Sequence, residues 1–253
     1  MRHGAKIAAR SALRGLTAWR RRRGLLRSRD GVAAIEFAFV APIMVAMLAG
    51  VYDLTTAFIA WRRVTAAALA IAEIATGEAA STVANTNILS QSQAVAAASA
   101  VYPYLPMLLQ SSPPAFGVTI SSIVMTPTVS GCTNGCTYTA HVAWSGVFEG
   151  TGQVRPCDTA QGTSGISSVS DTAKPSPTTL PVDVYSAAPL LVVDVTYTYK
   201  PMFFRFITGN VVMAQSSYLS PRTGLTTAWT QYFPSGSNDT TGLCAGYPAA
   251  TVS

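Results

Sequence analysis

Glu36 is the residue whose chemistry most needs an explanation. It lies five residues after Gly31 at the start of a long apolar run, and no side chain between Glu36 and Asp53 is charged. An unpaired carboxylate in a bilayer costs about 3 kcal/mol on insertion scales. Cleavage after Gly31 would make Val32 the first residue, and the new α-amino group of a neighbouring subunit would then neutralise Glu36. The alternative is that Glu36 faces lipid headgroups. The glycine and the basic residues upstream favour the processing interpretation.

Four cysteines, Cys132, Cys136, Cys157 and Cys244, all follow the apolar run. An even number of cysteines in an exported domain favours disulfides, and three pairings are possible. Because Cys132 and Cys136 enclose only a Thr-Asn-Gly turn, that pair together with Cys157–Cys244 is plausible, but the sequence alone does not choose. A zinc site needs CxxC-like pairs, which this spacing matches poorly. We therefore expect no metal and no cofactor.

His141 is the other residue with catalytic potential. It lies in an expected strand, and the only other histidine is His3 in the N-terminal tail. No histidine cluster or Ser-His-Asp set can be assembled, and the glycines near 146–152 lack the strand-turn-helix context of a phosphate loop. We expect His141 to face solvent, and we expect neither enzymatic activity nor a small-molecule substrate.

The apolar run predicts a membrane helix. A helix over Val32–Trp61 is roughly 45 Å long, more than the hydrocarbon core needs, and Arg62-Arg63 closes it. Pro42 removes one backbone hydrogen bond, so we expect a kink there. The alanine-rich sequence that follows extends the helix out of the bilayer, so that one helix covers roughly residues 32 to 76 and Gly77 ends it.

The basic residues are concentrated before this helix. Residues 1–30 carry ten Lys or Arg and one acid, whereas the remainder carries seven basic and ten acidic residues. A basic block before an apolar helix follows the positive-inside rule and is not evidence for nucleic-acid binding. We therefore expect a cytoplasmic leader and export of everything after Trp61. The apolar run is too long for a cleavable secretory signal.

The exported part is expected to be an α+β domain. A short alanine-rich helix at Gln91–Tyr102 ends at Pro103 and Pro106, and an antiparallel sheet of about four strands follows. The expected strands are Phe116–Val129, Thr137–Ser145, Leu190–Tyr199 and Val211–Leu219. The predicted organisation is a leader at 1–31, the helix at 32–76, the exported domain at 77–220 with a flexible insert near 149–188, and an irregular tail at 221–253.

The residues from Asp30 to Pro42, DGVAAIEFAFVAP, closely resemble the N-terminal signature of TadE-like proteins. These are minor pilins, or pseudopilins, of the tight-adherence (Flp, type IVb) pilus apparatus. The resemblance continues through Gly50–Asp53 and Arg63-Val64 to Ala75, about 45 residues in all. It implies a prepilin-peptidase site between Gly31 and Val32, and recognition of Glu36 and Phe37 by the peptidase and by pilus assembly.

The resemblance also implies a structural role in pilus assembly. The expected partners are the membrane, other pilins, assembly-platform proteins and a prepilin peptidase, and nucleic acid is not among them. The expected location is the inner membrane, crossed once, with the N-terminus in the cytoplasm. Small residues drive helix packing in lipid, and here they are Ala33, Ala34, Ala38 and Ala41. The alternatives are an unprocessed envelope protein whose disulfide-stapled domain binds a partner or surface, and an anchored periplasmic enzyme.

Overall fold

A computed structural model describes residues 29–79, 87–105, 116–159, 164–221, 229–234 and 241–250. The predicted leader up to residue 28, and Pro106, lie outside the described residues. The chain divides into two compact units: unit 1 is Met1–Leu54 and unit 2 is Thr55–Ser253. Each is described by itself.

One long helix, α2, covers Arg29–Ala79. It confirms the predicted apolar helix, continues through Pro42, and extends past Gly77, where we expected it to end. The part from Val32 to Glu78 is long and apolar enough to span a membrane. The kink at Pro42 remains a prediction.

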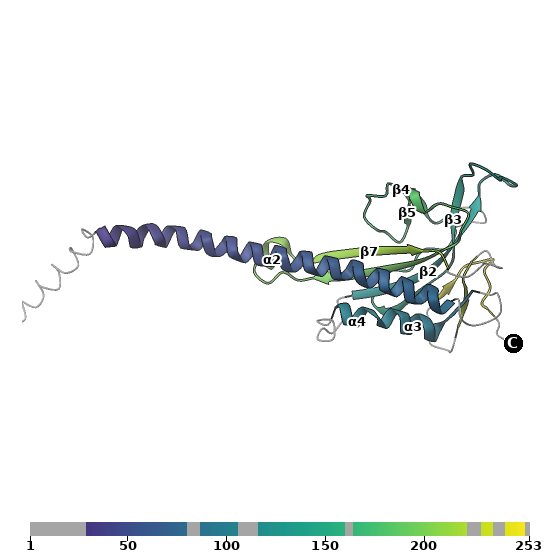
Figure 1. Cartoon of the computed structure of the whole chain (residues 1–253), viewed down its shortest axis with the longest axis horizontal. Coiled ribbons are helices and arrows are strands. Elements are labelled where there is room, and N and C mark those ends of the chain that lie inside the picture. The colour runs from purple at the N-terminus through teal and green to yellow at the C-terminus, as the bar shows by residue number, and fades with distance from the viewer. Residues whose placement is uncertain are drawn as a thin grey trace, which may run out of the picture. The chain divides into compact units, whose positions relative to one another are not determined.

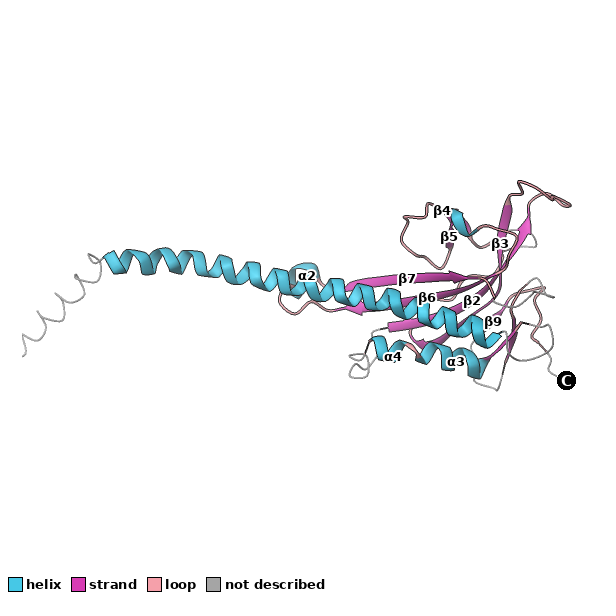
Figure 2. Ribbon diagram, viewed as in Figure 1, coloured by secondary structure: helices cyan, strands magenta, loops and turns pink. Residues whose placement is uncertain are grey.

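The main sheet of unit 2 is antiparallel and has the strand order β7-β6-β2-β3-β9 (Figure 2). Its strands are β2 (Phe116–Pro127), β3 (Tyr138–Gly150), β6 (Leu190–Tyr199), β7 (Val211–Leu219) and β9 (Gly242–Leu243). The four long strands lie where the alternation of Val, Ile, Thr and Tyr predicted them, which confirms the α+β class. The fifth, β9, lies within the predicted irregular tail and pairs with Trp144 and Ser145 of β3.

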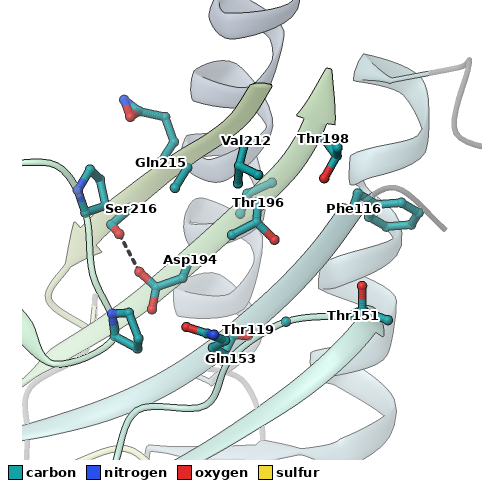
Figure 3. Close-up of a pocket in the computed structure, with 15 residues that line it drawn as sticks. Phe116, Thr119, Thr151, Gln153, Asp194, Thr196, Thr198, Val212, Gln215 and Ser216 are labelled. Atoms are coloured by element: carbon teal, nitrogen blue, oxygen red, sulfur yellow. Dashed lines mark hydrogen bonds between the residues drawn. The ribbon is translucent and has the colours of Figure 1, made fainter. Parts of the chain in front are cut away.

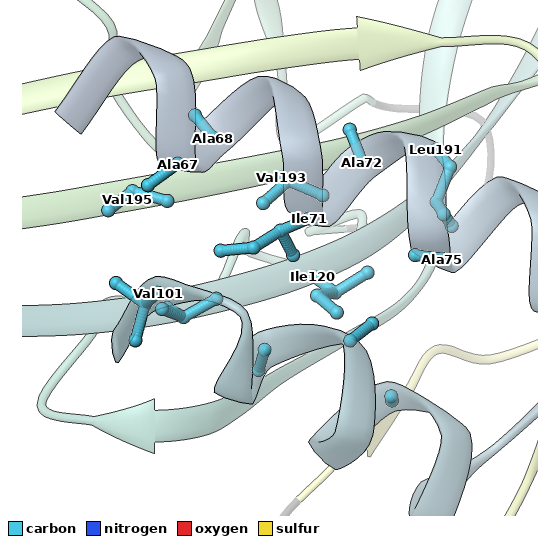
Figure 4. Packing of buried hydrophobic residues seen from close by; sticks show 14 of the residues in the cluster. Ala67, Ala68, Ile71, Ala72, Ala75, Val101, Ile120, Leu191, Val193 and Val195 are labelled. Carbon is cyan, nitrogen blue, oxygen red and sulfur yellow. The ribbon is translucent and has the colours of Figure 1, made fainter. Parts of the chain in front are cut away.

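Helices cover one face of this sheet. The second half of α2 turns a stripe of buried residues toward it, at the spacing of a single helix face: Val64, Ala67, Ala68, Ile71, Ala72 and Ala75. These pack with Ile120, Leu191, Val193 and Val195 of the strands (Figure 4). The alanines let the helix approach the sheet closely, so the alanine-rich stretch is a packing surface.

The predicted second helix is divided in two. α3 (Gln91–Ser99) and α4 (Val101–Tyr104) are separated at Ala100, and Pro103 lies inside α4. A capping box starts α3, because Ser90 Oγ accepts a bond from the Gln93 amide and Gln93 Oε1 accepts one from the Ser90 amide. The preceding strand β1 (Ile88–Ser90) pairs in parallel with β8 (Gln231–Phe233).

The segment after β3 covers the other face of the sheet. It contains β4 (Ser167–Val169), β5 (Thr179–Pro181) and the 3-10 helix η2 (Val182–Val184), with β4 and β5 parallel. Ile166 and Leu180 from this segment are buried against Ile123, Val142 and Val192 of the sheet. In its described residues, the predicted flexible insert therefore forms part of a second hydrophobic core.

Candidate functional site

The predicted processing and assembly residues all lie near the start of α2, in unit 1. Val32 is 54% exposed and Phe37 is 68% exposed, and Glu36 is exposed as well. Residues four apart share a helix face, so Glu36 lies one turn above Val32 on the same side. None of the described residues forms an ion pair with Glu36.

Apolar side chains surround Glu36 on every face of the helix. Ile35, Phe39, Val40 and Ile43 are each at least half exposed. A helix that is apolar all round is stable only in a non-aqueous environment, such as lipid or a bundle of other helices. A carboxylate in that environment needs a cationic partner, which is what the processing interpretation supplies.

Two disulfides form in unit 2. Cys132–Cys136 closes the turn between β2 and β3, and Cys157–Cys244 joins the start of the insert to the residue after β9. This is one of the three pairings that the sequence left open. The second bond connects residues 87 positions apart and attaches the C-terminal region to the insert.

Arg155 and Asp194 form an ion pair that the sequence does not predict. The side chain of Arg155 is fully buried and donates from Nε and Nη2 to the two carboxylate oxygens of Asp194, each at 2.8 Å. It also donates from Nη1 to the carbonyl of Thr179 at 3.0 Å. Asp194 accepts a further bond from Ser216. This carboxylate is thus held by several donors, and the pair fixes the insert to β6.

His141 does not face solvent, so that prediction is wrong. The residue is 9% exposed. Its Nδ1 lies 2.7 Å from Asp158 Oδ2, and its Nε2 lies 3.0 Å from Thr126 Oγ1. The insert explains the burial, because Asp158 follows Cys157 and approaches the strands with the disulfide. The network thus links β2, β3 and the insert.

A cavity of about 520 Å³ opens beside the Arg155–Asp194 pair (Figure 3). Strands β2, β6 and β7 supply much of its wall, including the hydroxyl groups of Thr119, Thr196, Thr198 and Ser216. The carboxylate of Asp194 is bonded to Ser216 at this wall (Figure 3). His141, Asp158 and Thr126 are not among the residues that line this cavity. Among the described residues, no three potential metal ligands cluster together.

The TadE-like protein family model matches residues 31–73. Comparison with curated proteins and with solved structures gave no match. The matched segment begins at Gly31, includes Glu36 and Phe37, and runs into the part of α2 that packs on the sheet. This match confirms the resemblance seen in the sequence: residues 31–73 are similar to the TadE-like family.

Proposed function

We propose that this protein is a membrane-anchored minor pilin that takes part in assembling a tight-adherence pilus. The observation that carries the proposal is the coincidence of the TadE-like match with an exposed, apolar helix in which Glu36 is the one acid between Val32 and Tyr52. Unit 1 is the anchor, and unit 2 is the exported domain. Its two disulfides suit an oxidising compartment outside the cytoplasm. The role is structural and involves no chemistry on a substrate.

In this proposal a prepilin peptidase hydrolyses the bond between Gly31 and Val32. The reaction removes the basic leader and creates an α-amino group on Val32, in a helix that remains in the membrane. Glu36 of an adjacent subunit then pairs with that group, which sets the register of neighbouring helices. The small residues Ala34, Ala38 and Ala41 share a helix face and let partner helices approach.

Mass spectrometry of the mature N-terminus tests the processing step. Protein from cells that contain the peptidase is expected to begin at Val32, and protein from cells without it is expected to retain the leader. Assembled pilus material whose chain begins at Met1 or Arg2 would contradict the proposal. Normal function of such an unprocessed chain would instead support a bitopic envelope protein that binds a partner through unit 2.

The substitution Glu36→Ala tests the assembly step. Removing a carboxylate from an apolar helix favours membrane insertion, so the variant is expected to reach the membrane normally. Its incorporation into pili is expected to fall at least about tenfold, because the loss of roughly 1.4 kcal/mol of pairing is sufficient for that change. Pulldown of pili, followed by quantification of the incorporated chain, compares Glu36→Ala with the unmodified chain.

Glu73→Ala is the matched control, because Glu73 is an exposed acid on the same helix but within unit 2. It is expected to leave incorporation unchanged. If Glu36→Ala assembles as well as Glu73→Ala does, Glu36 has no role in assembly.

A further inference from the structure

The segment between β6 and β7 exposes an unusual amount of apolar side chain. This segment, Lys200–Asn210, is called the β6–β7 loop below; it contains the short helix α5 (Arg205–Thr208) and turns back at Gly209, whose φ is +66°. Met202 is 71% exposed, Phe203 47% and Ile207 66%. Exposed apolar side chains gathered in one short segment of a folded domain indicate a surface that meets a partner or a membrane.

The charged residues between Tyr199 and Leu219 are all positive. Lys200 and Arg205 are both exposed, and no acidic residue occurs between Tyr199 and Leu219. Long cationic side chains beside apolar and aromatic groups are the combination found at lipid headgroups, where the cations reach phosphates and the apolar groups reach the acyl boundary. The composition therefore favours an anionic lipid surface over a protein partner.

Within unit 2, the loop lies at the end of the sheet where β7 begins (Figure 1). The hydroxyl of Tyr199, directly before the loop, is 2.6 Å from Oγ1 of Thr56. Thr56 is in the first turn of α2 within unit 2, since unit 1 ends at Leu54. A membrane span of about 20 residues that begins at Val32 ends near Tyr52, about one helical turn before Thr56.

Residues of α2 that follow Thr56 also have the composition expected next to a membrane surface. Phe58, Ile59 and Trp61 of α2 are 55%, 43% and 45% exposed. Trp and other aromatic residues are enriched where helices leave a bilayer. The turn between β2 and β3 lies at the opposite end of the sheet, because Phe116 at the start of β2 pairs with Tyr197 near the end of β6.

We propose that the β6–β7 loop is a second membrane contact, which rests in the anionic headgroup layer of the leaflet where α2 leaves the bilayer. The inference depends on the membrane anchoring in the proposed function and adds a lipid-binding surface in unit 2. Met202, Phe203 and Ile207 enter the acyl boundary, and Lys200 and Arg205 bind phosphates. The exported domain is then held to the bilayer at two places.

Site-specific photo-crosslinking of the full chain in vesicles tests this contact. Benzoylphenylalanine replaces Ile207 in one variant and Val129 in another. Both positions are 66% exposed, but Val129 lies in the turn between β2 and β3. A third variant carries the probe at Phe39, within the anchor. The vesicles contain phosphatidylglycerol and phosphatidylcholine, and mass spectrometry identifies the adducts.

The expected result is phospholipid adducts at positions 39 and 207 and none at 129. Adducts at 39 but not at 207, equal labelling at 207 and 129, or protein adducts at 207 in place of lipid would overturn the inference while the anchor stands. An absence of lipid adducts at 39 would show that the anchor itself fails, and the inference with it.

The charge requirement is tested with Lys200→Ala/Arg205→Ala combined with the probe at 207. Each cation near an anionic surface contributes about fivefold in binding, so lipid adducts at 207 are expected to fall more than about tenfold. Adducts at 39 are expected to be unchanged. Equal adduct yields at 207 with and without the two cations would contradict the assignment of an anionic surface.

Discussion

Arg155 holds the insert against the face of the sheet that the helices do not cover. Its side chain is 0% exposed and that of Asp194 is 16% exposed, and its guanidinium also reaches the carbonyl of Thr179. A buried ion pair adds little to stability compared with a well-packed apolar pair, but loss of one partner is costly. Arg155 thus specifies where the insert docks.

Arg155→Met is expected to lower the free energy of unfolding by about 3 kcal/mol, because it leaves the carboxylate of Asp194 without its cation. Urea unfolding of the detergent-solubilised chain, followed by near-ultraviolet circular dichroism, measures this change. Arg205→Met removes an exposed arginine and is expected to change the value by less than about 0.5 kcal/mol. Similar values for the two variants would show that the ion pair is dispensable.

Tyr218 is expected to make the stability of unit 2 depend on pH in the alkaline range. Burial raises the pKa of Tyr218 above the usual value of 10.0, and the nearby guanidinium of Arg155 opposes the shift. A raised pKa in the folded state means that the stability is fully present below the unfolded pKa and is lost as pH rises through the folded pKa. We therefore expect a decrease in stability above about pH 10. It should be smaller in Tyr218→Phe, as measured by unfolding together with tyrosinate absorbance.

Burial also raises the pKa of Tyr185, Tyr197 and Tyr247, so part of the alkaline loss is expected to persist in Tyr218→Phe. Tyr185→Phe is the matched comparison for Tyr218→Phe, because the Arg155 guanidinium also opposes the rise in the pKa of Tyr185. An alkaline decrease that is identical in Tyr218→Phe and the unmodified chain would exclude Tyr218 as a contributor.

At the scale of elements, the two disulfides differ in what they connect. Cys132–Cys136 spans four positions within one turn, whereas Cys157–Cys244 spans 87 and holds β9, the insert and the sheet together. The entropy that a crosslink removes from the unfolded chain grows with the length of the closed loop. The long-range bond is therefore the more important for stability.

Replacing Cys157 and Cys244 together by alanine is expected to lower the free energy of unfolding by about 4.5 kcal/mol, against about 2 kcal/mol for Cys132 and Cys136. Calorimetry or urea titration of the two double variants measures the difference. Equal losses would show that loop closure does not dominate.

The sequence predicts the elements that carry a long, regular pattern. The alternation in Val193–Tyr199 and the alanines of α2 each determine one face of an element, so their positions and burial follow directly. Strand β9 has only two residues, too short for any periodicity, and its place depends on pairing with Trp144 and Ser145.

Pairs of side chains that are far apart in the chain could not be predicted from the sequence for a similar reason. Asp194 is a polar position in an alternating strand, and nothing near it indicates that its partner lies 39 residues away. The insert that buries His141 has no regular pattern, so its position over the strand cannot be read from the sequence. The prediction therefore left His141 facing solvent. The predicted processing residues at Gly31–Phe37 could be named from the sequence because the motif that suggests them is local.

At the scale of the whole molecule, one helix belongs to both units. Unit 2 begins at Thr55, and its core contains Val64, Ile71 and Ala75 of α2. The sheet would expose the apolar residues of this face without the helix. Unit 2 therefore includes the second half of α2 as an obligatory part of its fold.

A fragment of residues 55–253 is expected to fold and remain monomeric, whereas a fragment of residues 80–253 is expected to aggregate. The shorter fragment lacks six buried apolar side chains of α2, and each deleted core residue larger than alanine costs about 1 to 3 kcal/mol. Circular dichroism and size-exclusion chromatography distinguish the outcomes. A folded 80–253 fragment would show that the helix is not part of the domain.

The continuity of α2 from Arg29 to Ala79 also determines how the protein responds to mechanical force. A pull on the anchor travels along one hydrogen-bonded helix and loads the side chains from Val64 to Ala75 in shear, so that these contacts must yield together. A hinged anchor would let them separate one at a time. In the proposed role, the helix transmits tension from the anchor to unit 2, as a subunit that is drawn out of a membrane with its domain folded requires.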